Sequence, residues 1–126
     1  MKSSYPRKVA IITGDLARSS SLPQGEITRA MRTLSDLFET EQHWVGENFT
    51  RQSGDGWQVV VPNFEGAIRS TLTMRATLRS LGPEFEAYFS IAVGDLLSAP
   101  PTNLNDTNEQ IFVKSGRELQ ILKERA

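Results

Sequence analysis

Hydrophobic residues recur three or four positions apart in three stretches of the chain, and this spacing predicts three helices. The first begins near Pro23 and has an apolar face made of Ile27, Ala30, Met31, Leu34, Leu37 and Phe38. The second covers residues 65–81, with a stripe of Ala67, Thr71, Met74, Leu78 and Leu81 that is widened by Ile68 and Leu72. In the third, over residues 106–125, Asp106 and Glu109 resemble a capping box and the inward positions are Ile111, Ser115, Leu119 and Leu122.

Four shorter stretches have the composition or the alternation of strands. Residues 8–13 form a compact β-branched run, residues 48–53 and 57–61 flank a Gly-Asp-Gly turn, and apolar residues alternate over 84–94. Residues 14–21 are predicted to form a loop, and residues 39–47 to connect the first helix to the second strand. The order is therefore strand, helix, strand, strand, helix, strand, helix.

This order predicts an α+β fold of the ferredoxin-like βαββαβ type, an antiparallel sheet with helices packed on one face. The length of 126 residues suits a single domain that spans residues 1–126. In this topology the first strand lies beside the central hairpin. The end of the first strand then meets the tip of the hairpin, and we expect Asp15 to lie close to Asp55.

Composition and charge narrow the classes of function. The formal net charge is -1 and the basic residues lack interleaved aromatics, so a nucleic-acid partner is not expected. The chain has no cysteine and one histidine, which excludes thiolate sites, disfavours a histidine-based zinc site and suits a cytoplasmic location. No apolar run approaches roughly 18 residues, so no membrane span is predicted. A metal ion bound to this chain would be held by oxygen atoms.

Asp15 and Asp55 are the candidates for such a site, because each follows a glycine at the end of a predicted strand or at a turn. Gly54 and Gly56 permit positive φ and close backbone approach, so the turn presents the Asp55 carboxylate at its tip. Two adjacent carboxylates repel unless a cation neutralises them, and Mg²⁺ or Mn²⁺ would do so, with the carbonyl of Leu16 as a further ligand. The alternative is that these Gly-Asp pairs only form turns.

Four motifs carry a resemblance to a known family. I-T-G-D-L-A-R-S-S, R-Q-S-G-D-G-W, S-I-A-V-G-D and D-T-N-E-Q-I-F-V-K-S-G-R-E-L resemble, in this order, the class III nucleotidyl cyclase catalytic domain, and more closely its short bacterial SatD-like relatives. The resemblance spans residues 9–122 and implies the same ferredoxin-like fold. It also implies metal binding by Asp15 and Asp55 with the carbonyl of Leu16, and stabilisation of transition-state charge by Arg117.

The resemblance further implies a nucleotide site. Arg51 and Asp106 match the positions that select the base, although the family has a lysine at the first of them. The implied nucleotide-binding residues are Arg18, Arg51, Gly54, Gly56 and Asp106. The implied partner is a nucleoside triphosphate or another nucleotide, and a homodimer would allow Arg117 to act across the interface.

Three departures from the family lower the expected catalytic activity. Val113 replaces an asparagine that orients the ribose, Arg18 replaces a glycine, and the family's phosphate-binding lysine on a late strand has no counterpart before Ala126. Each lost positioning or charge contact typically costs several kcal/mol of transition-state stabilisation. We therefore expect a nucleotide- and metal-binding regulatory or sensor domain with weak or no turnover. Two alternatives stay open: an active nucleotidyl cyclase or phosphoryl-transfer enzyme working as a homodimer, and an interaction domain without a metal site.

Overall fold

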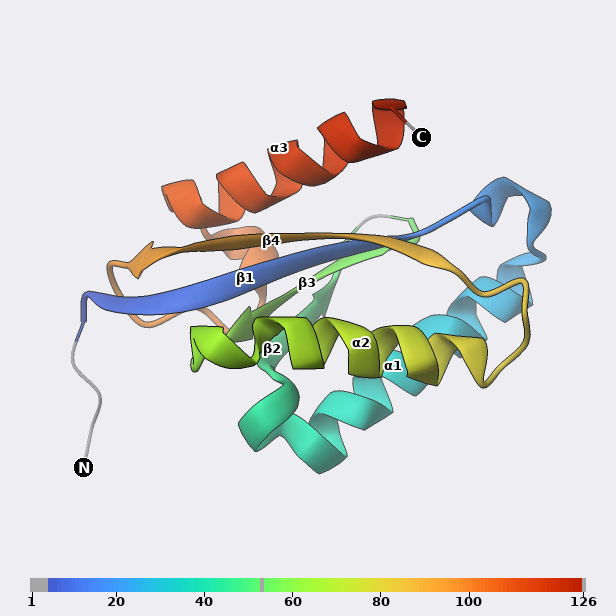
Figure 1. Cartoon of the computed structure of the whole chain (residues 1–126), viewed down its shortest axis with the longest axis horizontal. Coiled ribbons are helices and arrows are strands. Elements are labelled where there is room, and N and C mark those ends of the chain that lie inside the picture. The colour runs from blue at the N-terminus through green and yellow to red at the C-terminus, as the bar shows by residue number, and fades with distance from the viewer. Residues whose placement is uncertain (1–4, 53, 126) are drawn as a thin grey trace.

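The computed structural model describes residues 5–52 and 54–125, apart from the side chains of residues 41–43. It is a four-stranded antiparallel sheet of strand order β2-β3-β1-β4 with helices on both faces (Figure 1). The strands are β1 (Arg7–Leu16), β2 (Glu47–Arg51), β3 (Gly56–Val61) and β4 (Ala87–Leu96). The helices are α1 (Gln24–Val45), α2 (Ala67–Arg79) and α3 (Gln110–Arg125), and the short 3-10 segments are η1 (Ser19–Ser21), η2 (Phe64–Gly66) and η3 (Leu104–Asp106).

The predicted α+β class and ferredoxin-like order are confirmed, because β1 lies between β3 and β4 and the helices α1 and α2 cover one face of the sheet (Figure 1). The third helix differs from the expectation that helices pack on one face. α3 lies on the opposite face, where it packs against β1 and β4. Both faces of the sheet are therefore covered, and the side-chain pattern of β1 explains why.

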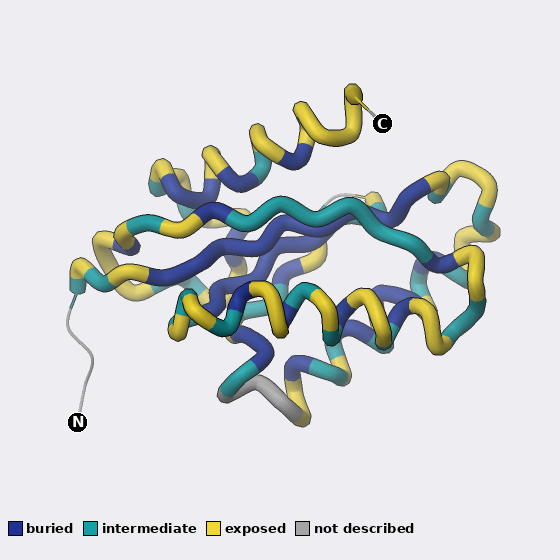
Figure 2. Tube along the Cα trace, viewed as in Figure 1, coloured by how far each residue is buried: buried dark blue, intermediate teal, exposed yellow. Residues whose placement is uncertain are grey.

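Alternate residues of β1 supply two separate cores, because successive side chains of a strand point to opposite faces. Ala10, Ile12 and Leu16 pack in the larger core, beneath α1 and α2. Val9 and Ile11 pack in the smaller core, beneath α3. A strand buried on both faces has a continuous apolar sequence, which is what V-A-I-I at residues 9–12 provides. Figure 2 shows β1 as a buried stretch through the middle of the sheet.

On the face that α3 covers, the sheet changes from apolar to polar toward the end of β1. Strand pairing aligns residues of β3, β1 and β4 in successive rows: Val60–Ile11–Ala92, then Gln58–Thr13–Ser90, then Gly56–Asp15–Tyr88. The first row belongs to the smaller core. The second row carries hydroxyl and amide groups, and the third carries the carboxylate of Asp15. The core on this face therefore ends where a polar region begins.

Two elements extend beyond their predicted ends. β1 continues through Gly14 to Leu16, so the predicted loop is wrong over these three residues. Pairing with both β3 and β4 outweighs the local turn preference of the Gly-Asp pair. α1 continues to Val45 instead of giving way to a connection over 39–47. Val45 is fully buried and lies seven residues after Phe38, so the apolar face of the helix continues for two more turns.

The predicted capping box at the start of the third helix is wrong. α3 begins at Gln110, and Asp106 belongs to η3. The Glu109 carboxylate instead accepts hydrogen bonds of 2.8 Å from the backbone N–H of Leu97 and 2.9 Å from the hydroxyl of Ser98. This carboxylate therefore ties the segment after β4 to the start of α3, a long-range contact that local sequence spacing does not reveal.

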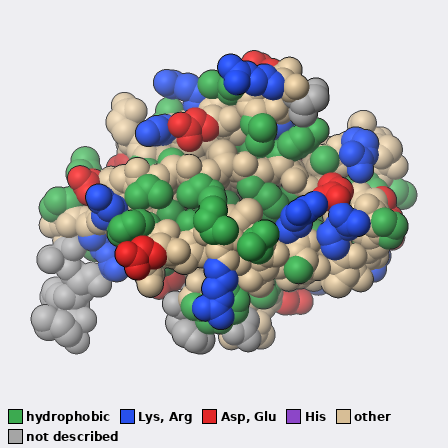
Figure 3. Space-filling model, in the orientation of Figure 1, with side chains coloured by type: hydrophobic (Ala, Val, Ile, Leu, Met, Phe, Trp, Pro, Cys, Tyr) green, Lys and Arg blue, Asp and Glu red, His purple; other side chains and the backbone are tan. Residues whose placement is uncertain are grey.

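Some apolar positions that were expected to face inward are exposed. Ile68 and Leu72 of α2 are 64% and 58% exposed, and Leu122 of α3 is 41% exposed. The buried stripe of α2 is narrower than predicted and consists of Ala67, Ser70, Met74 and Leu78. Figure 3 shows hydrophobic side chains gathered on the face of the molecule that carries β4 and α2. None of the helices within residues 5–52 and 54–125 has the length and apolar character needed to cross a bilayer.

Candidate functional site

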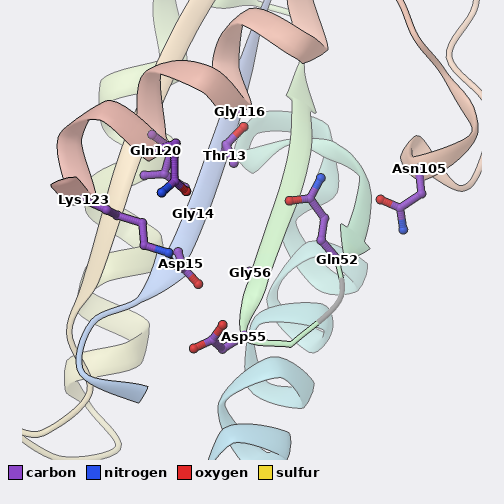
Figure 4. A pocket seen from close by; sticks show the side chains of 11 residues that line it. Thr13, Gly14, Asp15, Gln52, Asp55, Gly56, Asn105, Gly116, Gln120 and Lys123 are labelled. Atoms are coloured by element: carbon purple, nitrogen blue, oxygen red, sulfur yellow. Dashed lines mark ion pairs between the residues drawn. The ribbon is translucent and has the colours of Figure 1, made fainter. Parts of the chain in front are cut away.

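A polar pocket of about 510 Å³ lies where the end of β1 meets the hairpin between β2 and β3, beside the last turns of α3 (Figure 4). Polar side chains from β1, the hairpin, η3 and α3 converge on it. They include Asp15, Gln52, Asp55, Asn105, Gln120 and Lys123. Both aspartates that the sequence singles out therefore line one pocket.

Strand pairing brings the two aspartates together. Asp15 lies opposite Gly56 in the ladder between β1 and β3, and Asp55 immediately precedes that glycine. The N–H of Leu16 donates a hydrogen bond of 3.1 Å to the carbonyl of Asp55. A Cβ at position 56 would lie 3.2 Å from the Gly14 carbonyl oxygen and 3.5 Å from Asp15 Oδ1, so a side chain there would crowd the contact. The expectation that the first strand meets the hairpin tip is confirmed.

The backbone of the hairpin fixes the position of Asp55. Gly54 has a φ of 82°, a conformation that glycine adopts without strain. The N–H of Gln52 donates to the Gly56 carbonyl at 2.9 Å and closes the turn. The Nε–H of Arg51 donates to the Gly54 carbonyl at 3.0 Å. Arg51 therefore stabilises the turn in this structure, and its role in base selection stays a prediction.

The carboxyl groups of Asp15 and Asp55 interact with each other, and their pKa values move in opposite directions. Burial raises the pKa of Asp15; the Lys123 ammonium opposes this rise and Asp55 adds to it. Burial also acts to raise the pKa of Asp55, but hydrogen bonds with the Ser19 hydroxyl and with Asp15 outweigh it, so that pKa is lowered. Carboxyl pairs whose pKa values are pushed apart are typical of functional sites.

Lys123, near the end of α3, forms an ion pair with Oδ2 of Asp15 (Figure 4). The hydrogen bond to Asp15 raises the pKa of this lysine. Sequence reasoning misses Lys123, although a signal exists. Ser115, Leu119 and Lys123 follow one another at intervals of four, and residues at this spacing share a helix face. The inward face of α3 therefore continues to Lys123 and not to Leu122.

A buried polar network beside the pocket holds α3 over the sheet. The Ser115 hydroxyl lies 2.6 Å from the Thr13 hydroxyl and donates to the Ile11 carbonyl at 3.1 Å. The Gln58 amide donates to Oγ1 of Thr13 at 2.9 Å and to a backbone carbonyl of α3 at 3.1 Å. A buried network whose members are paired favours one arrangement. It therefore sets the position of α3 on the sheet, and with it the place from which Lys123 reaches the pocket.

The donor set of the pocket suits a small, hard cation. Mg²⁺ is usually held by one or two carboxylates and completes its shell with water and substrate phosphates. The pair of Asp15 and Asp55 matches this requirement, and Mn²⁺ accepts the same oxygen ligands. Among the described residues, no cluster of three or more His, Cys, Asp or Glu side chains forms. The site therefore fits Mg²⁺ or Mn²⁺ better than Ca²⁺, which takes roughly six to eight oxygen ligands. Binding by the carbonyl of Leu16 stays a prediction.

Most of the other predicted nucleotide-binding residues, and the predicted catalytic residue Arg117, do not line this pocket. Gly54 lines a cavity of about 370 Å³ beside η1. Arg117 lines a cavity of about 420 Å³ that shares part of its wall with the pocket. Arg18 and Asp106 are exposed, the first immediately before η1 and the second in η3. Gly56 does line the pocket. The roles of these residues in binding or catalysis stay predictions.

Besides Gln120 of α3, the pocket is lined by two more amide side chains that the sequence prediction does not include, those of Gln52 and Asn105. Gln52 directly follows Arg51, and Asn105 directly precedes Asp106, so each is one residue from a position predicted to select the base. At the end of β2 a shift of one residue matters, because adjacent side chains of extended chain point to opposite sides. Figure 4 shows both amides on the side of the pocket away from Lys123.

No protein-family model matches the sequence, and no curated protein matches it. Solved structures do match. The catalytic core of a rhodopsin-guanylyl cyclase in complex with ATPαS has a TM-score of 0.65 and 14% identity over 89% of this chain and 71% of that one. A bacterial light-regulated adenylyl cyclase has a TM-score of 0.65 and 14% identity over 95% and 72%. An adenylate/guanylate cyclase/hydrolase from Silicibacter pomeroyi has a TM-score of 0.56 and 18% identity over 94% and 72%.

At these identities the similarity establishes the fold and leaves the activity to be argued from the site. The resemblance to SatD-like proteins stays a prediction, since no family model supports it. The comparison with adenylyl and guanylyl cyclases agrees with the predicted α+β class. This chain has the fold of the nucleotidyl cyclase catalytic domains.

Proposed function

We propose that this chain is a nucleotide- and divalent-metal-binding regulatory or sensor domain of the nucleotidyl cyclase superfamily, with weak or no turnover. The observation that carries the proposal is that Asp15 and Asp55 line one polar pocket, where each carboxyl group affects the pKa of the other. Two neighbouring carboxylates repel each other, so a fold that keeps them together is typical of a binding or catalytic site.

The pocket offers suitable groups for each part of a metal–nucleotide complex. Asp15 and Asp55 would hold the ion, which when bound supplies positive charge for the oxygens of a phosphate. Gln52 and Asn105 each carry an amide donor and acceptor, which suits the edge of a base or a ribose hydroxyl. The volume of about 510 Å³ falls within the range of small-molecule sites. The nucleotide bound to the similar guanylyl cyclase core supports the ligand class.

Weak or no turnover is proposed on the basis of two side chains. Val113 stands where the resembling family has an asparagine, and its side chain has no group that could hydrogen-bond a ribose. Arg117 is exposed and lines the adjoining cavity, not the pocket of the aspartates. Electrostatic catalysis depends on donors that are already in place when charge develops. An exposed arginine outside the pocket does not meet that condition within one chain.

Titration calorimetry with nucleoside triphosphates, in the presence and absence of Mn²⁺, tests the proposal. We expect nucleotide binding that requires the metal and is lost in Asp55→Asn, which removes the negative charge but keeps the shape of the side chain. Asp36→Asn, on the exposed face of α1, is the matched control and should bind like the unchanged protein. Chromatography of the nucleotides after incubation then measures turnover.

The outcomes separate the three candidate functions. Metal-dependent binding with little or no cyclic product supports the sensor. Metal-dependent binding with steady conversion of the nucleotide would favour an active cyclase or phosphoryl-transfer enzyme. Absence of any metal-dependent binding would overturn the proposal and favour an interaction domain in which the two aspartates only shape the end of the sheet.

A further inference from the structure

The pocket already contains a cation that belongs to the chain. The ammonium of Lys123 reaches from α3 across to β1 and pairs with Oδ2 of Asp15. It also interacts electrostatically with Asp55 and with Tyr88 of β4. The other oxygen of Asp15, Oδ1, lies toward Gly56 and the hairpin. One positive group of the protein is thus placed against the carboxylate pair from the side opposite the hairpin tip.

We propose that Lys123 is an internal competitor of the divalent metal ion, which must displace the lysine from Asp15 before both aspartates can bind the metal. This inference rests on the proposed function, since it concerns the same two aspartates. Its consequence is a site whose apparent metal affinity is lower than that of the two aspartates alone. The lysine thereby raises the metal concentration at which the site becomes half occupied.

Two physical facts make the competition effective. A divalent ion and an ammonium on the same carboxylate lie within a few ångströms of each other and repel. The lysine is also tethered, so its concentration at the site is set by the fold and does not fall on dilution. The hydrogen bonds of Ser115 to Thr13 and Ile11 hold α3 on the sheet and keep the tether short. The lysine therefore returns to Asp15 whenever the metal leaves.

A metal ion can nevertheless displace the ammonium of Lys123 from Asp15. The side chain of Lys123 is 37% exposed, whereas that of Asp15 is only 9% exposed. A partly exposed lysine gains modest energy from an ion pair and regains conformational freedom when the pair opens. The ammonium can move into solvent while the aspartate stays in place. The expected effect of the lysine on the metal affinity is therefore a factor of roughly two to five, not a complete block.

Titration of the full chain with Mn²⁺ alone, followed by electron paramagnetic resonance of the free ion, tests the inference. Lys123→Met removes the charge but keeps a flexible stem, and we expect it to bind Mn²⁺ roughly two to five times more tightly. Lys123→Arg keeps the charge and should bind no more tightly than the unchanged protein. Lys114→Met makes the same charge change about 13 Å away along the same helix and is the matched control, which should have no comparable effect.

A second measurement follows the lysine itself. Amine-reactive labelling read by mass spectrometry should report faster modification of Lys123 when Mn²⁺ saturates the site, with the rate at Lys114 unchanged. Because position 123 lies near the end of α3 and is exposed, the Lys123→Met protein is expected to fold. Thermal unfolding checks this, and Lys123→Gln provides a second neutral side chain.

The outcomes separate this inference from the proposed function. Mn²⁺ binding that depends on Asp55 but is equal in the unchanged and Lys123→Met proteins would overturn the inference and leave the proposed function standing. Mn²⁺ binding that becomes weaker in Lys123→Met would also overturn it, since the lysine would then assist the metal. If neither protein shows Mn²⁺ binding that Asp55→Asn removes, both the inference and the proposed metal site are overturned.

Discussion

Gly14 of β1 lies directly opposite Trp57 of β3, and the indole of Trp57 occupies the space that a side chain at position 14 would need. A Cβ on Gly14 would lie 2.8 Å from Nε1 of Trp57 and closer still to two carbons of the ring. Phe89 of β4 also pairs with Gly14, and its ring meets that of Trp57 edge to face with centroids 5.9 Å apart. The glycine of the T-G-D motif is thus a packing residue. It lets two aromatic rings cover the strand on one face while Asp15 points to the other.

This relationship predicts that Gly14→Ala is destabilising. Trp57 is fully buried, so its ring has no room to move away from an added methyl group. Overpacking of this kind typically costs about 1–3 kcal/mol. Urea unfolding followed by tryptophan fluorescence measures the change in the free energy of unfolding. A loss below about 0.5 kcal/mol would show that the ring relocates without cost.

Gly116→Ala is the matched control for that change. Gly116 also borders the pocket, but a Cβ there would meet nothing within 4 Å. Because glycine in the middle of a helix is unfavourable relative to alanine, we expect a gain of about 0.5–1 kcal/mol in the free energy of unfolding. The two substitutions add the same methyl group on neighbouring elements. Crowding against Trp57 makes the first unfavourable, whereas the helix preference of alanine makes the second favourable.

We predict that Ser115→Ala destabilises the chain and loosens α3. The Ser115 hydroxyl is fully buried and donates to the Ile11 carbonyl, and the Thr13 hydroxyl lies 2.6 Å from it. Removing it leaves buried polar groups unpaired, which costs about 1–3 kcal/mol. Chemical unfolding measures the loss, and hydrogen exchange of the α3 amides should become faster. Ser80→Ala, an exposed serine after α2, should stay within about 0.5 kcal/mol of the unchanged protein.

The buried carboxyl of Asp15 predicts a pH-dependent effect of Asp15→Asn. Burial raises the pKa of Asp15 above 3.8, so the folded chain holds this proton more tightly than the unfolded chain does. The stability that the proton contributes is present below the unfolded pKa and is lost as the pH rises through the folded pKa. Asparagine has no proton to lose. The stability of Asp15→Asn relative to the unchanged protein should therefore increase from about pH 3 to about pH 7.

Thermal unfolding across this pH range measures the difference in Tm between the two proteins. Asp36→Asn, at an exposed position of α1, should give a difference that hardly changes with pH. A difference that moves in the opposite direction for Asp15→Asn would mean that the ion pair with Lys123 outweighs burial, and that the pKa of Asp15 is lowered in the folded chain.

The position of the amides predicts which side chains choose the nucleotide. Gln52 and Asn105 line the pocket, whereas Arg51 is exposed and donates to the Gly54 carbonyl. We therefore expect Gln52→Ala and Asn105→Ala to change the relative affinities for the nucleoside triphosphates by roughly tenfold, the effect of a lost hydrogen bond of about 1.4 kcal/mol. Arg51→Ala should weaken the binding of all the nucleoside triphosphates by the same factor. Competition titrations with Mn²⁺ present measure these ratios, and a base preference that changes only in Arg51→Ala would restore the sequence-based assignment.

Several features of the fold can be predicted from local patterns. The apolar face of α1 has a helical period, and its residues Ile27, Ala30, Leu34 and Phe38 are buried as that period requires. The order of the elements leads to the ferredoxin-like sheet, and the sheet places the end of β1 beside the hairpin. The proximity of Asp15 and Asp55 follows from this topology. Because β3 runs antiparallel to β1, the start of β3 and the hairpin before it lie beside the end of β1.

Other features depend on contacts between distant residues, which no local pattern contains. The turn preference of Gly14 and Asp15 is real, but pairing on both sides of β1 and the ring of Trp57 override it. The one-residue difference between Arg51 and Gln52 at the pocket depends on which way the chain leaves β2. The carboxylate of Glu109 accepts hydrogen bonds from Leu97 and Ser98 after β4 and does not cap a helix.

The amino-acid sequence by itself determined the class of fold and the meeting of two carboxylates at the end of β1, because both follow from periodicity and the order of elements. Only the tertiary structure decided that α3 covers the second face of the sheet and carries Lys123 to Asp15. The reason is physical. An amphipathic helix specifies that one of its faces is buried, but the surface that buries it is chosen by the packing and hydrogen bonding of residues far away in the chain.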